Sequence, residues 1–119
     1  MEDWIANTNY MGEFENKPKH QVVLWFWEVV TSYEQEQKAK LLQFVTGTTG
    51  VPAQGFGSLQ GNDGNIRKFT LNGDRNVAVL PRAHTCFNRI DLPIYASKQD
   101  LQKYLTMAIC MGVTGFDME

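Results

Sequence analysis

An apolar stripe at helical spacing runs through residues 22–29. Four apolar side chains follow one another at steps of three and four residues: Val22, Trp25, Phe26 and Val29. This spacing places them on one face of an α-helix, with the neighbouring Trp27 and Leu24 widening that face. A helical pattern also occurs in three other segments, at residues 3–7, 38–45 and 101–108. We therefore expect a short helical turn and three longer helices whose apolar faces enter the core.

Capping signals suggest where two of these helices begin and end. Ser32, with Gln35 three residues later, is the expected N-cap of the helix that Gly47 would end. Ser97, with Asp100 three residues later, is the expected N-cap of the last helix.

The region between the second and third long helices is rich in turn signals. Asn62-Asp63-Gly64 and Asn72-Gly73-Asp74 enclose a possible strand at residues 66–71. Two further candidates lie at residues 77–80 and 86–92. The sequence thus predicts an α+β fold, with helices packed on a small, mostly antiparallel sheet.

The composition is typical of one compact soluble domain. The chain has 119 residues, of which 43% are hydrophobic and 20% are charged, so it can bury one core and is not disordered in composition. We expect a single domain over residues 1–119 with a flexible tail at residues 113–119. The net charge of -2, without a basic cluster, argues against a nucleic-acid partner.

Two cysteines, Cys86 and Cys110, are too few for a disulfide scaffold and lack the paired spacing of a zinc site. No apolar run approaches the roughly 18 residues that a spanning helix requires, so membrane insertion is not expected. These features favour an intracellular protein in the cytosol, with the nucleus as another location, and no metal.

The two cysteines differ in their neighbours. Cys86 lies within four residues of Arg82, His84 and Arg89, and cations favour the nucleophilic thiolate. Cys110 falls in the last turn of the final helix, where unpaired carbonyls disfavour a negative charge. Cys86 is therefore the candidate nucleophile.

The spacing alone leaves a structural role for Cys86 open. A cysteine in a strand is more often a small core residue than a nucleophile. In an extended segment, His84, Cys86 and Asn88 would share one face, and Thr85 and Phe87 would lie on the other.

Residues 80–88 read Leu-Pro-Arg-Ala-His-Thr-Cys-Phe-Asn. This segment resembles the cysteine motif in the C-terminal lobe of HECT-type ubiquitin ligases, and most of all their NEDD4-like branch. The tripeptide Trp25-Phe26-Trp27, residues 41–48 and the terminal Gly115-Phe116 are also similar to that lobe. The resemblance extends over nearly the whole chain.

The resemblance implies that Cys86 accepts ubiquitin from a conjugating enzyme as a thioester and passes it to a substrate lysine. It implies that His84, Thr85 and Asn88 support this site, and that Phe116 docks the tail on the larger lobe of the ligase. No cofactor is implied. The larger lobe that recruits the conjugating enzyme has no counterpart in this chain, so we expect weak activity from the chain alone.

Two other functions stay open. A non-catalytic ubiquitin-binding module would pair the ubiquitin tail with a strand edge at Leu80, Pro81, Arg82 and Ala83. A cysteine hydrolase would release its acyl group to water, and the lack of a credible base and oxyanion hole counts against it.

Overall fold

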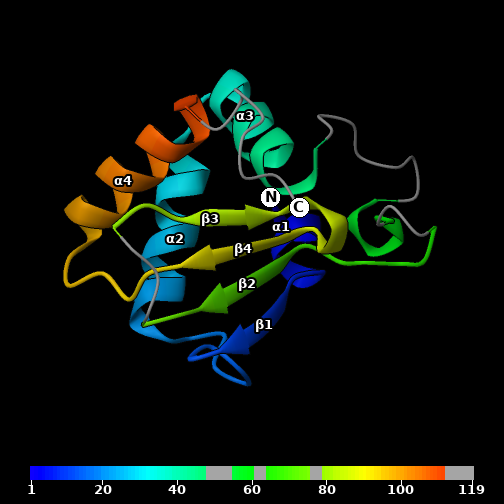
Figure 1. Ribbon diagram of the computed structural model, residues 1–119, viewed down its shortest axis with the longest axis horizontal. Coiled ribbons are helices and arrows are strands. Elements are labelled where there is room, and N and C mark those ends of the chain that lie inside the picture. The colour runs from blue at the N-terminus through cyan, green and yellow to red at the C-terminus, as the bar shows by residue number, and fades with distance from the viewer. Residues whose placement is uncertain (48–54, 61–63, 76–78, 112–119) are drawn as a thin grey trace.

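The computed structural model describes residues 1–47, 55–60, 64–75 and 79–111. Four short strands form one mixed sheet in the order β1-β2-β4-β3 (Figure 1). Their bounds are Asn9–Gly12 for β1, Thr70–Gly73 for β2, Arg82–His84 for β3 and Arg89–Leu92 for β4. The helices are α1 (Glu2–Ala6), α2 (Gln21–Ser32), α3 (Gln35–Thr46) and α4 (Lys98–Met111), with short 3-10 turns η1 (Phe56–Ser58) and η2 (Thr85–Phe87).

The helices pack against one side of the sheet. Figure 1 shows α2 crossing behind the strands, while α3 contacts β3 and α4 packs against both α2 and α3. Leu71 on β2 and Ile90 and Leu92 on β4 are fully buried, because alternate residues of a strand point to the same face. The core therefore lies between this face of the sheet and the helices.

The predicted stripe of α2 is confirmed. Val22, Phe26 and Val29 are buried, as is Trp27, whereas Trp25 is half-buried at the edge of the core. Leu24, which we expected to widen the stripe, is exposed instead. The aromatic cluster thus packs within the fold, as apolar side chains at helical spacing normally do.

The expected start of α3 is wrong, and its expected end is confirmed. The N-cap of α3 is Glu34, whose backbone N–H donates to Oε1 of Gln37 at 3.1 Å. The Ser32 hydroxyl instead donates to the Val29 carbonyl at 2.6 Å, inside the last turn of α2. Gly47 follows α3 with φ of 81°, a left-handed conformation that glycine adopts without steric cost.

The last helix starts as expected. Ser97 Oγ accepts a hydrogen bond from the Asp100 backbone N–H at 3.1 Å, which satisfies one of the unpaired donors at the start of α4. The buried face of α4 consists of Leu101, Leu105, Ala108 and Ile109.

The strand predictions were less accurate than the helix predictions. Strand β2 covers residues 70–73, so it includes Asn72 and Gly73, which we expected in a turn. Strand β1, at residues 9–12, was missed altogether. The expected strand at residues 77–80 lies partly outside the described residues, and Val79 and Leu80 form a bend before β3. The expected strand at residues 86–92 is shorter and begins at Arg89.

The α+β class is confirmed, but the expectation of mostly antiparallel pairing is wrong. Strands β1 and β2 are parallel, β2 and β4 are parallel, and only β3 and β4 are antiparallel. Parallel neighbours need long connections, and residues 13–69, which include α2 and α3, connect β1 to β2. Only the four residues 85–88 connect β3 to β4, which makes that pair a hairpin.

None of the described helices combines the length and apolar character required to cross a bilayer. The expected flexible tail at residues 113–119 lies outside the described residues.

Candidate active site

Cys86 lies in the 3-10 turn η2, which connects β3 to β4 at one end of the sheet (Figure 1). The expectation that Cys86 belongs to a strand is therefore wrong, and the inferred alternation of faces over residues 84–88 does not apply. Cys86 is partly exposed, so the core does not enclose its side chain. Cys110 is exposed on α4.

The end of this turn is held by Asn88. Its backbone has φ of 53°, in the left-handed region that asparagine tolerates better than most residues. The residue is 1% exposed, and its Nδ2 donates to the carbonyls of Arg67 at 2.7 Å and Gln60 at 3.1 Å. Asn88 therefore ends the turn and fastens it to the segment before β2.

The beginning of the turn is held by His84. Its Nε2 lies 2.7 Å from Oδ2 of Asp91 on the adjacent strand β4. Arg89 Nε also donates to Asp91, to Oδ1 at 3.1 Å. Two of the basic side chains that we expected to act on Cys86, His84 and Arg89, thus contact the Asp91 carboxylate instead.

Asp91 is the site residue that sequence reasoning missed. It is 7% exposed and also accepts a hydrogen bond from Asn72 Nδ2 at 2.9 Å. One signal was available, because Asp91 stands between the apolar residues Ile90 and Leu92 in a predicted strand. A carboxylate at such a position requires nearby donors, but the sequence does not identify them.

Thr85, the first residue of η2, lies beside Gly47, which follows the C-terminal end of α3. The Cβ that a side chain at Gly47 would add lies 3.9 Å from Cβ of Thr85. The helix end and the cysteine turn are therefore in close proximity, and α3 helps to position η2.

Phe87 and its surroundings form the outer side of the turn. Phe87 is 49% exposed, and the Arg67 guanidinium carbon lies 5.6 Å from the centroid of its ring. This distance is typical of a cation–π contact. Phe87 thus places an exposed aromatic side chain directly after Cys86 in the turn.

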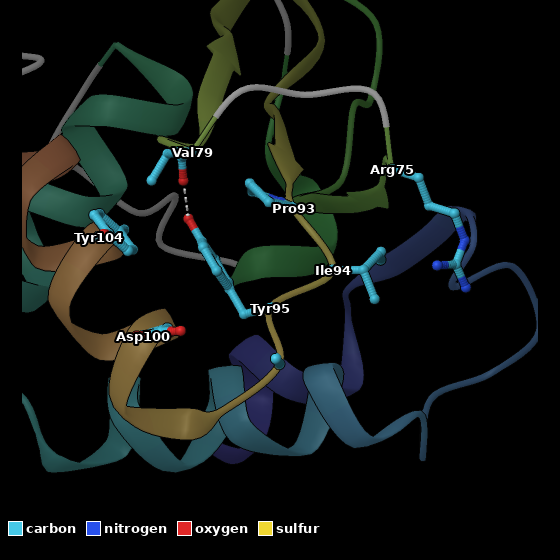
Figure 2. Close-up of a pocket in the computed structure, with 8 residues that line it drawn as sticks. Arg75, Val79, Pro93, Ile94, Tyr95, Asp100 and Tyr104 are labelled. Carbon is cyan, nitrogen blue, oxygen red and sulfur yellow. Dashed lines mark hydrogen bonds between the residues drawn. The ribbon is translucent and has the colours of Figure 1, made fainter.

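The segment before the turn combines buried and exposed residues. Pro81 and Ala83 are buried, Leu80 is half-buried and Arg82 is exposed. Just before it, the Val79 carbonyl accepts a hydrogen bond from Tyr95 Oη at 2.6 Å, beside a hollow that Tyr104 also lines (Figure 2). The segment is therefore anchored to the connection between β4 and α4. Phe116 lies outside the described residues.

No group of three or more His, Cys, Asp or Glu side chains that could hold a metal ion occurs in the described part of the chain. The candidate site consists of Cys86, the side chains of His84 and Asn88, which hold its turn, and Asp91.

Comparison with known proteins identifies the family. The family model described as HECT-domain (ubiquitin-transferase) matches residues 1–119. The chain is 49% identical to E3 ubiquitin-protein ligase pub1 of Schizosaccharomyces pombe, 45% identical to RSP5 of Saccharomyces cerevisiae and 45% identical to HECW1 of Homo sapiens. Each match includes 92% of this chain but only 14%, 13% and 7% of the respective relative. The chain belongs to the HECT-domain family, and within it to the NEDD4-like branch.

Proposed function

We propose that this chain is the cysteine-bearing lobe of a HECT ubiquitin ligase and that Cys86 carries ubiquitin as a thioester. The observation that supports this most directly is the position of Cys86, which is partly exposed in a turn whose two ends are held by side-chain hydrogen bonds. Such a turn presents the sulfur to a partner without enclosing it.

The proposed reaction has two steps. In the first, Cys86 loses its thiol proton and its sulfur attacks the thioester carbonyl of ubiquitin on a conjugating enzyme, whose own thiol is released. In the second, a substrate lysine amine attacks the new thioester, an amide forms, and the Cys86 thiol is restored with a proton from the amine.

The first step exchanges one thioester for another and is close to thermoneutral, so placement of the sulfur matters more than a strong base. The contacts of His84 support this interpretation, because its ring is held against Asp91. We propose that His84 and Thr85 orient the turn, and that Asn88 fixes its backbone.

A binding role for residues 80–83 belongs to the same proposal. Among the described strands, β3 lies at one edge of the sheet and pairs only with β4. An edge strand offers backbone groups to an extended peptide. We propose that the ubiquitin tail runs beside Leu80, Pro81, Arg82 and Ala83 toward Cys86. We also propose that the protein acts in the cytosol or the nucleus.

The same edge keeps a second candidate function open, a non-catalytic ubiquitin-binding module. The two functions differ in their dependence on the sulfur. Replacement Cys86→Ser would leave binding and function intact in such a module, whereas it would abolish a labile thioester in the ligase.

The test is incubation with ubiquitin-charged conjugating enzyme, in a protein that joins this chain to the larger lobe, followed by a gel without reducing agent. We expect a ubiquitin adduct that survives Cys110→Ala and disappears with Cys86→Ala or with added thiol. An adduct that does not depend on Cys86 would refute the proposal.

The same assay addresses Phe116, whose role is supported by the family resemblance. Deletion of Phe116 should slow transfer to lysine more than it slows adduct formation on Cys86. Equal slowing of both steps would contradict a specific role in transfer.

A further inference from the structure

The buried carboxylate of Asp91 connects the centre of the sheet to the cysteine turn. Asp91 lies on β4, between β2 and β3, and its register partners are Asn72 on β2 and Arg82 on β3. Its two oxygens contact side chains from three strands, namely Asn72 of β2, His84 of β3 and Arg89 of β4 itself. The strands on both sides thus fix the position of the carboxylate.

His84 transmits this fixed position to the site. It is the last residue of β3 and directly precedes Thr85–Phe87, so its backbone sets where the turn begins. The contact of 2.7 Å between His84 Nε2 and Asp91 Oδ2 is the shortest of the three. This short hydrogen bond restricts the rotation of the His84 ring. The restricted side chain in turn limits the movement of the backbone where the turn begins.

The stability of the fold alone does not explain why the Asp91 carboxylate is buried. Removal of a charge from water is costly, and well-packed apolar residues often stabilise a fold as well as a buried ion pair does. The carboxylate therefore calls for a role that an apolar side chain could not fill.

We propose that Asp91 is a positioning residue: through His84 it fixes the turn so that the Cys86 sulfur meets the donor thioester at the correct distance and angle. This inference rests on the proposed function. Asp91 itself touches neither the sulfur nor ubiquitin in this scheme, and its effect on the reaction depends on the His84 side chain.

The main experiment is a double-mutant cycle on the rate of ubiquitin loading. It uses Cys110→Ala protein with the larger lobe present and compares Asp91→Asn, His84→Ala and the double variant in single-turnover reactions with charged conjugating enzyme. We expect each single change to slow loading by roughly 10- to 100-fold, as small misplacements of reacting groups do. The double variant should be about as slow as the slower single variant.

A conservative replacement separates positioning from a general loss of structure. In His84→Gln, the side-chain amide can still donate a hydrogen bond to Asp91 but cannot act as a base. We expect His84→Gln to restore most of the loading rate that His84→Ala loses. The matched control Asp100→Asn, which removes an exposed carboxylate on α4, should change the rate less than about twofold.

The outcomes are distinguishable. Multiplicative losses in the double variant, or loading by Asp91→Asn at the rate of the control, would overturn the role of Asp91. If Asp91→Asn does not fold, as circular dichroism would show, the inference depends on the comparison of His84→Gln with His84→Ala, and equal rates overturn it. A parent protein that never carries ubiquitin on Cys86 would instead refute the proposed function.

Discussion

At the scale of single residues, Asn88 controls the geometry of the cysteine turn. It combines a left-handed backbone, with φ of 53°, and near-complete burial, since the residue is 1% exposed. Its amide donates to the carbonyls of Gln60 and Arg67, which belong to a segment distant in sequence. One residue thus both reverses the chain after Cys86 and fastens the turn to the body of the domain.

Replacement of Asn88 should separate these two contributions. In Asn88→Ala, the carbonyls of Gln60 and Arg67 lose their donor and the left-handed backbone becomes strained, so we expect the free energy of unfolding to fall by about 2–4 kcal/mol. Asn88→Gly loses the same hydrogen bonds but tolerates the backbone, so it should be more stable than Asn88→Ala by about 1 kcal/mol. Urea denaturation measures both, and equal losses would show that the positive φ carries no cost.

The residues of the site could be predicted from the sequence to the extent that they are neighbours along the chain. His84, Thr85, Cys86 and Asn88 surround one turn because they are consecutive or nearly so. The conformation of that turn was wrongly predicted, since the contacts that hold Asn88 come from residues 60 and 67. Asp91 was missed because its contacts with Asn72 on β2 and His84 on β3 depend on how the strands pair, which the local sequence does not specify.

At the scale of elements, helices were predicted better than strands. The period of α2 and the capping of α4 depend on residues within one segment, and both are confirmed. The direction and register of strands depend on where the chain returns, and neither β1 nor its parallel pairing with β2 is evident in the local pattern. The misplaced cap of α3 shows a limit even for helices, because the observed N-cap, Glu34, is not one of the residue types preferred at that position.

The two serines allow a matched test of capping. Ser97→Ala removes the acceptor for the Asp100 N–H at the start of α4, and we expect a loss of about 1 kcal/mol in the free energy of unfolding. Ser32→Ala removes only a hydrogen bond back to the Val29 carbonyl, so a change within about 0.5 kcal/mol is expected. Thermal or urea denaturation distinguishes the two, and a larger loss from Ser32→Ala would contradict the assignment of Glu34 as the N-cap.

At the scale of the whole molecule, two tyrosines connect α4 and the segment before it to the rest of the fold. Tyr33, at the end of α2, shares a hydrogen bond of 2.7 Å with the Thr106 hydroxyl on α4. Tyr95 donates to the Val79 carbonyl and stacks on Tyr104, with ring centroids 5.9 Å apart (Figure 2). Burial raises the pKa of both phenols above the ordinary value, and the nearby Tyr104 and Asp100 add to the rise in the pKa of Tyr95.

These shifts predict a loss of stability in alkaline solution. A phenol whose pKa is higher in the folded state binds its proton more tightly there, so its contribution to stability is complete below the ordinary tyrosine pKa of about 10 and decreases as the pH rises above it. We expect the free energy of unfolding to fall between about pH 10 and pH 12, and to fall less steeply in the Tyr33→Phe/Tyr95→Phe double variant. Urea denaturation across this range measures the free energy of unfolding of both proteins. The difference between the two values excludes the contribution of lysine titration, because that contribution is common to both. Parallel pH profiles would mean that the two phenols ionise as easily in the folded chain as in the unfolded one.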